Sequence, residues 1–350
     1  MATVRFHAEA TLRLLISIVQ TSAADGTGIS HTVTASLTGK TSYNLPVTSR
    51  LQIHESVIDA LATGRPVVAL ESTISSTLGL PVPANHDVVT RCVAAIRAGG
   101  GVAAMTAVID GVAHVGVDDR HLDRVLTATR KCAERDLPVA LAQKWDVGVT
   151  TVSATVALCA LAGVSVFATG GIGGVHRDDH LSGDVSADLG AIARHPVLVV
   201  TAGAKAFLDL GKTLELFDTL GVPVLGYQTA EFPAFYSRSS GFAVQQRVES
   251  AAEAAAVLRA RTELGLPGGV VLANPLPAEA EIPASELREV IESALEDAKR
   301  AGISGGALTP FVLGRMAVTT GGRSVPANLA LAENNACVAV QVAAALTRPD

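Results

Sequence analysis

Short runs of consecutive apolar residues alternate with helical patterns along most of this chain. Such runs lie at 67–70, 196–200 and 268–273, and they lack the alternation of a strand with one solvated face. Strands of this kind are buried on both sides and pack between helices. Asp110-Gly111 joins two further strands in an expected antiparallel hairpin. The pattern predicts a single α/β domain over residues 49–350, a three-layer α/β/α sandwich around a mixed, mostly parallel sheet.

Hydrophobic periodicity and turn residues give the other expected elements. The helix at 150–162 is apolar nearly all round, so we expect it to be buried. Further strands are predicted at 102–108, 113–117, 138–142 and 223–226, and further helices at 51–62, 85–97, 118–129, 207–220, 251–264, 283–301, 310–320 and 325–346.

The composition excludes several classes of protein. A chain of 350 residues, 49% of them hydrophobic, can bury a large core. The net charge of −6 and the lack of a basic run argue against nucleic acid as the main partner, because phosphate-backbone binding relies on clustered Lys and Arg. No window reaches the roughly 18 continuous apolar residues of a membrane helix. Cys92, Cys132, Cys159 and Cys337 form no CxxC pair, which favours a reducing, cytoplasmic setting without structural zinc.

The first 48 residues differ from the rest of the chain. The apolar run at 14–19 is shorter than the core of a signal peptide, so secretion is not expected. Residues 20–49 are rich in Ser, Thr, Gly and Ala and show little periodicity. We expect residues 1–48 to be a poorly ordered segment, an unrecognised targeting leader or the product of an over-extended translation start.

A glycine-rich segment follows the apolar run that ends at Ala168. Thr169 opens the run TGGIGG, which leads into His176-Arg177 and then into acids through Asp188. Glycine lets the backbone approach a ligand closely and turn its N–H groups toward an anion. We interpret the segment as a phosphate-binding loop followed by a carboxylate-bearing helix start. A plain tight turn explains the glycines equally well.

Two charged residues follow buried strands. Glu71 ends the strand at 67–70 and is a candidate site residue, although a loop cap or an ion pair with arginine fits the same position. Lys205 follows the strand at 196–200, and partial burial there would disfavour its ammonium form. A neutral amine can attack a carbonyl carbon. A helix-start lysine that binds a phosphate is an equally good interpretation.

Three further features are relevant to the candidate site. Lys131 fits a solvated cation at a helix end as well as a ligand contact. The aromatic, basic loop at 229–241 either lines a pocket or supplies its rings to the core. The last helix contains Asn328, Asn334 and Asn335, and asparagine is a poor helix former unless its side chain bonds something.

Seven separated segments carry a family resemblance. They are ALESTI at 69–74, ATGGIGGVHR at 168–177, DVSADL at 184–189, AGAK at 202–205, EFPAFYSRSSG at 231–241, ANP at 273–275 and TPF at 309–311. With these segments, in this order, the chain resembles the pseudouridine-5′-phosphate glycosidase family, also called the indigoidine synthase A-like family, from about residue 51 to the C-terminus.

The resemblance implies an activity, a cofactor and an assembly. The family reversibly cleaves pseudouridine 5′-phosphate with water to uracil and ribose 5-phosphate, is aided by a divalent metal, usually Mn²⁺, and forms homotrimers. By this resemblance Lys205 forms the covalent sugar adduct, Glu71 is the proton donor and Asp184 holds the metal. The expected substrate contacts are Lys131, Val152, Thr169, His176, Ser186, Ala187, Asp188 and Asn328.

The chemistry of the bond agrees with these roles. A carbon–carbon glycosidic bond has no heteroatom leaving group, so two carboxylates that protonate a glycosidic oxygen do not suffice. An iminium between Lys205 and the sugar C1′ activates that carbon, while an acid protonates uracil C5. We expect Glu71 to act in ring opening and proton transfer and Asp188 to be a second proton carrier. Asp184 alone fits a hard Mn²⁺ that keeps most of its waters.

Lys131, His176 and the TGGIGG backbone are expected to hold the 5′-phosphate. Two departures from the family spacing, an extra residue within 75–79 and another within 143–146, can change the pocket shape. The alternatives are therefore a Schiff-base sugar-phosphate lyase acting on another base, with a role in pigment synthesis included, and a non-catalytic sugar-phosphate or nucleotide binder. The lysine argues against the binder, because binding alone needs no nucleophile.

Overall fold

The computed structural model describes residues 15–22, 29–37, 41–46 and 50–348. The chain divides into two compact units, residues 1–49 and 50–350. In the first unit, β1 (Leu15–Ser22), β2 (Ile29–Leu37) and β3 (Thr41–Pro46) form an antiparallel sheet, which the sequence analysis did not predict. The other residues of 1–48 lie outside the described residues, and the interpretation of this segment as a leader stays a prediction.

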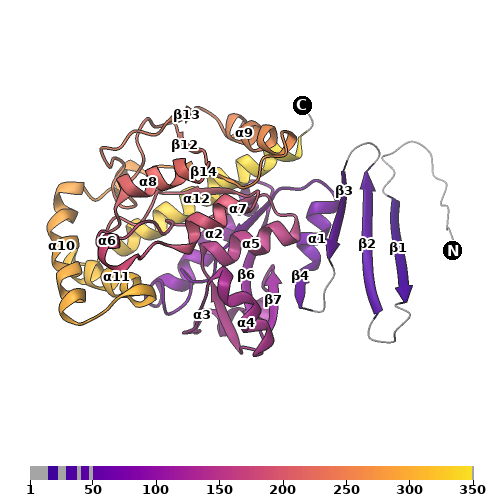
Figure 1. The fold of residues 1–350 in the computed structure, drawn as a ribbon, viewed down its shortest axis with the longest axis horizontal. Coiled ribbons are helices and arrows are strands. Elements are labelled where there is room, and N and C mark those ends of the chain that lie inside the picture. The colour runs from indigo at the N-terminus through magenta and orange to yellow at the C-terminus, as the bar shows by residue number, and fades with distance from the viewer. Residues whose placement is uncertain (1–14, 23–28, 38–40, 47–49, 349–350) are drawn as a thin grey trace. The chain divides into compact units, whose positions relative to one another are not determined.

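The second unit is built around one mixed sheet of eleven strands (Figure 1). The strand order is β13-β12-β14-β11-β10-β5-β6-β7-β4, with β9 beside β6 and β8 beside β9. From β13 to β6 all neighbouring strands are parallel, whereas β7 and β9 run antiparallel to β6. The strands are β4 (Leu51–Ile53), β5 (Val67–Leu70), β6 (Val102–Ile109), β7 (Val112–Val115), β8 (Lys131–Cys132), β9 (Val147–Thr150), β10 (Val166–Ala168), β11 (Leu198–Thr201), β12 (Val224–Tyr227), β13 (Gln246–Val248) and β14 (Val270–Ala273).

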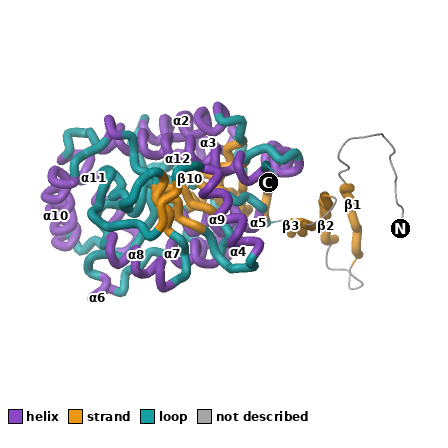
Figure 2. The backbone as a smooth tube through the Cα atoms, turned by 90° about the horizontal axis from the view of Figure 1, so that it is seen from above, coloured by secondary structure: helices purple, strands orange, loops and turns teal. Residues whose placement is uncertain are grey.

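Helices cover both faces of this sheet (Figure 2). On one face α12 packs against α2, α9 and the strands β5, β10 and β11, and on the other face α5 packs against α7. The helices are α1 (Glu55–Ala62), α2 (Ala84–Ala98), α3 (Asp119–Leu126), α4 (Leu137–Ala142), α5 (Val152–Ala162), α6 (Asp179–Ser182), α7 (Ala187–Arg194), α8 (Leu210–Thr219), α9 (Ala251–Glu263), α10 (Ala284–Arg300), α11 (Leu308–Thr319) and α12 (Ser324–Thr347), with 3-10 turns at Glu134–Asp136, Ala278–Ala280 and Gly305–Ala307. The predicted α/β/α class with a mixed, mostly parallel sheet is confirmed.

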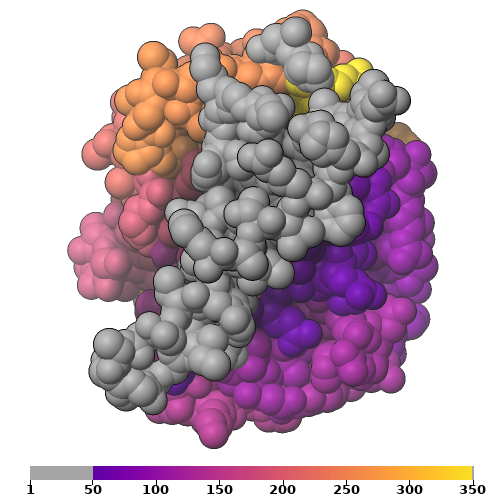
Figure 3. Space-filling model, turned by 90° about the vertical axis from the view of Figure 1, so that its right-hand side faces the viewer, coloured from indigo at the N-terminus to yellow at the C-terminus, as the bar shows by residue number. Residues whose placement is uncertain are grey.

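The main hydrophobic core runs through the whole of the second unit. It extends from Val57 in α1 to Ala343 in α12 and includes the central strands, which are buried along their length as their unbroken apolar sequence predicted. In Figure 3 the first half of this unit, indigo to magenta, lies below the C-terminal segments, orange to yellow. The core therefore joins segments from both halves of this part of the chain.

Helix α12 is long and apolar enough to cross a membrane by length and composition, and it is the one such helix among the described residues. Of its most apolar window, 56% is buried inside the protein. Its contacts with α2, α9 and the sheet explain the apolar sequence, because a helix that is covered on several sides needs apolar residues all round. Helix α5 is buried for the same reason, as predicted.

Several predicted elements were wrong. Residues 138–142 form part of helix α4 and not a strand, because Pro138 stands in the first helical turn, where the lack of an N–H costs no hydrogen bond. Residues 51–53 form a strand, and α1 begins only after His54, whose side chain accepts a hydrogen bond from the Ser56 N–H. Strands β8, β9 and β13 were not predicted. The helix expected from 207 begins at Leu210, so Lys205 lies in a loop.

Candidate active site

The site lies where strands end side by side. Glu71 follows β5, Thr169 follows β10 and Lys205 lies in the loop after β11. These three strands are parallel neighbours, so their carboxyl ends lie at one edge of the sheet, which is the usual place for a ligand in an α/β fold. Strand β9 ends at the same edge. It runs antiparallel to β6, and its last residue that pairs with β6, Val149, lies opposite Ala107, two residues after Met105, which pairs with the end of β5.

A pocket of about 220 Å³ collects most of the predicted site residues. Thr169 is the exception and lies behind the pocket. The predicted residues that line it are Glu71, Lys131, Val152, His176, Asp184, Ser186, Ala187, Asp188, Lys205 and Asn328. The structure thus brings together residues from six separate segments.

Other lining residues were not singled out from the sequence. Arg135 lies in the turn after β8, and Gly305, Gly306, Thr309 and Leu313 come from the segment between α10 and the middle of α11. The TPF motif within the family resemblance was the available signal for this second segment. Its distance from the rest of the site in sequence gave no indication that it closes the pocket.

Asp188 is fixed at the start of α7. Ser186 caps this helix, and its hydroxyl oxygen accepts a hydrogen bond from the Asp188 N–H at 3.2 Å. The Asp188 carboxylate accepts from the Gly173 N–H at 2.8 Å with one oxygen and from the Ser153 N–H at 3.0 Å with the other. Because the side chain is buried and both oxygens are bonded, Asp188 is held in one orientation at the pocket wall. The predicted carboxylate-bearing helix start is confirmed.

The TGGIGG run forms an inner wall of the pocket. The Ile172 N–H donates to the Gly203 carbonyl at 3.1 Å, and the Gly173 N–H donates to Asp188. A Cβ atom on Gly173 would clash with the side chains of Ser186 and Asp188, so only glycine fits at this position. These two N–H groups are therefore already used within the protein, and a role of this backbone in phosphate binding stays a prediction.

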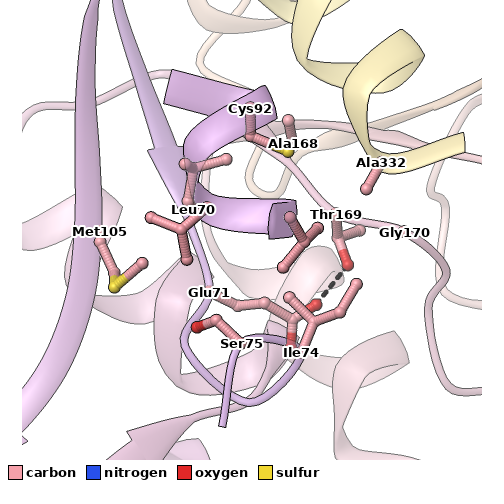
Figure 4. A pocket seen from close by; sticks show the side chains of 12 residues that line it. Leu70, Glu71, Ile74, Ser75, Cys92, Met105, Ala168, Thr169, Gly170 and Ala332 are labelled. Atoms are coloured by element: carbon pink, nitrogen blue, oxygen red, sulfur yellow. Dashed lines mark hydrogen bonds between the residues drawn. The ribbon is translucent and has the colours of Figure 1, made fainter. Parts of the chain in front are cut away.

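Glu71 lines both the pocket and a small cavity of about 20 Å³, whose residues are drawn in Figure 4. The cavity is lined mainly by apolar side chains, among them Met105 and Cys92, and it is too small for an organic substrate. The Thr169 hydroxyl donates a hydrogen bond to the Glu71 carboxyl. Burial raises the pKa of Glu71 to about 7, against the lowering effects of the Lys205 charge and the Thr169 hydrogen bond.

Two lysines share the pocket with Glu71. Lys131 lies in β8, not at a helix end, and its Nζ donates to the Gly306 carbonyl at 3.0 Å. Burial lowers the pKa of Lys131, and the charge of Lys205 adds to this effect. Because both lysines also act electrostatically on Glu71, an amine, a second cation and an acid surround one space.

Asp184 is the predicted metal ligand. Its Oδ2 lies 3.7 Å from His176 Nε2, and burial lowers the pKa of His176 although the Asp184 charge opposes this. Among residues 50–348, no three His, Cys, Asp or Glu side chains are grouped so as to hold a metal ion. A lone, partly exposed carboxylate nevertheless fits a hard divalent ion that keeps most of its waters. The residues present fit a hydrated ion and not a closed cage of protein ligands.

The aromatic loop serves both of its expected purposes. Phe235 lines the pocket and meets Tyr236 edge to face, with ring centroids 4.6 Å apart. Tyr236 and Phe232 are buried in the core. Next to this loop, Asn328 is 5% exposed, lines the pocket and has an Oδ1 atom without a hydrogen-bond partner in the described part of the chain. A buried acceptor of this kind is costly unless a ligand donates to it.

The sequence model of indigoidine synthase A-like proteins matches residues 56–345. This chain belongs to the indigoidine synthase A-like family. Among its relatives, the pseudouridine-5′-phosphate glycosidase of Solibacter usitatus is 50% identical over 295 residues, which cover 84% of this chain and 98% of the relative. That of Deinococcus radiodurans is 48% identical over 302 residues, covering 86% and 96%.

Two solved structures share the fold of this family member. The prealnumycin C-glycosynthase AlnA in complex with ribulose 5-phosphate is 33% identical with a TM-score of 0.79, covering 86% of this chain and 98% of AlnA. The indigoidine synthase A-like protein of Thermotoga maritima is 32% identical with a TM-score of 0.77, covering 85% and 97%. The sheet and helices described above are therefore those of the indigoidine synthase A-like family.

Proposed function

We propose that this protein reversibly cleaves the carbon–carbon glycosidic bond of pseudouridine 5′-phosphate with water, giving uracil and ribose 5-phosphate. The observation that carries the proposal is the amine of Lys205 in one pocket with Glu71, whose pKa is about 7. An acid of that pKa can both give and take a proton at neutral pH. Relatives that bear the name of this activity align with the chain over nearly their whole length.

The first step forms the covalent adduct. After the Lys205 ammonium has lost a proton to solvent, its amine attacks C1′ while Glu71 gives its proton to the ring oxygen, so the C1′–N bond forms and the C1′–O4′ bond breaks. The proton that the new C1′ ammonium loses passes to Asp188. The product is an open-chain sugar that is joined both to the lysine nitrogen and to uracil C5.

The second step breaks the glycosidic bond, and the third releases the sugar. The nitrogen lone pair forms an iminium with C1′ as the C1′–C5 bond breaks, its electron pair stays with uracil C5, and Asp188 returns its proton there. Water then adds to the iminium, Glu71 accepts the released proton, and ribose 5-phosphate leaves as the aldehyde. Both carboxyls end in their starting forms, and one water molecule is consumed.

The 5′-phosphate and the base would contact different walls of the pocket. Lys131, Arg135 and the N-termini of α5 and α7 supply positive charge for the 5′-phosphate. Asn328 lines the pocket, and a rotation of its side chain would bring its unpaired, buried Oδ1 to an N–H of uracil. Asp184 would hold the divalent ion, with Mn²⁺ as the expected metal, and a bound Mn²⁺ supplies positive charge and ordered water beside the sugar.

The assembly and the cell compartment are part of the proposal. The family resemblance supports a homotrimer, and the free state of Cys92, Cys132, Cys159 and Cys337 is compatible with a reducing cytoplasm. Light scattering of the purified protein tests the trimer: a mass of three chains is expected, and a monomer at micromolar concentration would contradict it.

A second candidate is a C-glycosyl transfer between a pentose phosphate and another aromatic acceptor. It is favoured by the likeness to AlnA, whose structure contains ribulose 5-phosphate. Uracil release from pseudouridine 5′-phosphate, followed by liquid chromatography in the presence of Mn²⁺, separates the two. We expect release from this substrate and none from uridine 5′-phosphate, whose base is joined through nitrogen. No release, together with binding of ribose 5-phosphate, would favour the other acceptor.

A further inference from the structure

An asparagine inside α12 uses its whole amide. Asn335 is fully buried in this long helix, where its side chain would be unfavourable without partners. Its Oδ1 accepts from Asn274 Nδ2 at 2.9 Å. Its Nδ2 donates to the Thr169 carbonyl at 2.7 Å and lies 3.4 Å from the Gly170 carbonyl. The ANP segment and the asparagines of the last helix, both conspicuous in the sequence, thus meet at the Thr169–Gly170 turn.

These two amides bridge across a strand. Asn274 follows β14 and Thr169 follows β10, and β11 lies between these strands. The Asn274 N–H also donates to the Thr201 carbonyl at 2.8 Å, and the Thr169 N–H donates to the Val200 carbonyl at 3.0 Å. The backbone at the end of β10 is therefore hydrogen-bonded to β11 through the Thr169 N–H and to α12 through the Thr169 carbonyl.

The residue held in this way is the one that contacts Glu71. Among the residues that the structure describes, Thr169 is the only one whose side chain or backbone donates a hydrogen bond to the Glu71 carboxyl. The small cavity beside this pair is lined by apolar groups, among them Ala332, which lies one helical turn before Asn335 (Figure 4). Ser75 is the other hydroxyl in that wall, and it donates to the Ser72 carbonyl at 3.0 Å, so its hydrogen bond is already used within the protein.

We propose that Asn335 is a positioning residue for Glu71: its amide fixes the Thr169 turn and thereby keeps the Thr169 hydroxyl on the Glu71 carboxyl. Asn335 touches no substrate in this account, and Asn274 orients its amide. This proposal rests on the proposed function in one respect, the role of Glu71 as the catalytic acid. The hydrogen bonds from Asn335 to the Thr169 carbonyl and from the Thr169 hydroxyl to Glu71 do not depend on that role.

The consequence is a shift in the ionisation of Glu71. A hydrogen bond donated to a carboxyl stabilises the ionised form, so its loss raises the pKa. A bond to a charged group is strong enough to move a pKa by about one unit. Asn335→Ala and Thr169→Val are therefore both expected to move the Glu71 step in the pH profile of kcat upward by about one unit. Thr169→Ser keeps the hydroxyl and is expected to leave this step in place.

Asn334 provides a matched control. Its Nδ2 donates to the Pro275 carbonyl at 3.1 Å, so it joins the same helix to the same loop without touching Thr169. We expect Asn334→Ala to leave the pH step unchanged even if it lowers the melting temperature. A purely structural role of Asn335 predicts equal pH profiles for Asn334→Ala and Asn335→Ala, and that result would overturn the proposal.

A second measurement follows Glu71 without turnover. The melting temperature is recorded against pH for Asn335→Ala and for the same variant with Glu71→Gln, and the difference between the curves reports the ionisation of Glu71. In the Asn335→Ala background, we expect the pH at which this difference in melting temperature changes to be higher than in the background that keeps Asn335. A protein that cleaves no pseudouridine 5′-phosphate but shows this change would refute the proposed function and support the positioning role. An unchanged difference refutes the positioning role.

Folding failure of one variant does not remove the test. Asn274→Ala leaves the contacts of Asn335 with the Thr169 and Gly170 carbonyls but frees its amide to rotate, so it is expected to shift the same step in the same direction by a smaller amount. An unshifted step in folded Asn274→Ala and in folded Thr169→Val would contradict the proposed route from Asn335 to Glu71.

Discussion

The Asp188 carboxylate and the backbone N–H of Gly173 are joined by a 2.8 Å hydrogen bond, which ties the start of α7 to the glycine run after β10. The bond exists because Gly173 has no side chain: a Cβ there would meet Ser186 and Asp188. One glycine thus allows two parts of the pocket wall to touch.

Substitution of this glycine tests that relationship. Gly173→Ala is expected to push Asp188 aside and to lower kcat by about 100-fold, the scale of loss that a displacement of about 1 Å produces at a reacting centre. Gly64→Ala is the matched control, because no atom lies within 4 Å of a Cβ at that position and Gly64 does not line the pocket. Its positive φ of 69° makes the substitution cost stability, but not kcat. Equal kcat values for Gly173→Ala and the parent would refute the role of this contact.

Burial of Glu71 makes stability depend on pH with a defined sign. Its pKa is raised from 4.5 to about 7 on folding, so the folded protein binds the proton more tightly than the unfolded chain. This contribution is fully present below pH 4.5 and is lost as the pH rises through 7. Relative to Glu71→Gln, the parent is expected to lose on the order of 3 kcal/mol of unfolding free energy over that window. If the unfolding free energies of the parent and Glu71→Gln differ by the same amount at pH 4.5 and at pH 7, a buried, protonated Glu71 is contradicted.

Asp184 is expected to carry the metal dependence. Asp184→Ala is predicted to raise the Mn²⁺ concentration for half-maximal activity by more than about tenfold, which corresponds to about 1.4 kcal/mol of binding. Asp179→Asn is a control on the neighbouring helix α6, because Asp179 pairs with Lys212 and does not line the pocket. An unchanged Mn²⁺ titration of Asp184→Ala would assign the ion to other residues.

The first 48 residues are expected to be dispensable for catalysis. The compact unit at 50–350 contains the eleven-stranded sheet, the main hydrophobic core and every residue of the pocket. Deletion of residues 1–48 is therefore predicted to leave kcat, KM and the melting temperature nearly unchanged. A large fall in either the activity or the melting temperature would show that this segment contributes to the folded enzyme.

The buried strands were predictable from local sequence. Val67–Leu70 and Leu198–Thr201 are unbroken apolar runs, and their burial on both faces is the physical cause of that pattern. Residues 137–142 show the limit of such reasoning, since a short apolar run fits a strand and a buried helix equally well. Strand β9 was missed because four residues before a helix carry little pattern of their own.

The candidate site was predictable only in part. The residues near strand ends, Glu71 and Lys205, followed from position and from the family resemblance. The contact of Lys131 with Gly306 joins residues 175 positions apart, and no local pattern encodes such a pairing. Thr169 was expected to touch the substrate, yet it lies behind the pocket against Glu71. That contact depends on the register between β5 and β10, which becomes visible only in the folded chain.

The covalent role of Lys205 is the central claim, and borohydride trapping tests it most directly. The protein is incubated with ribose 5-phosphate and Mn²⁺, reduced with borohydride and weighed intact by mass spectrometry, with Lys205→Ala treated in parallel. We expect one reduced pentose-phosphate adduct on the parent protein and none on Lys205→Ala, with both proteins folded. An adduct on both proteins, or none on a parent that demonstrably binds ribose 5-phosphate, would contradict it.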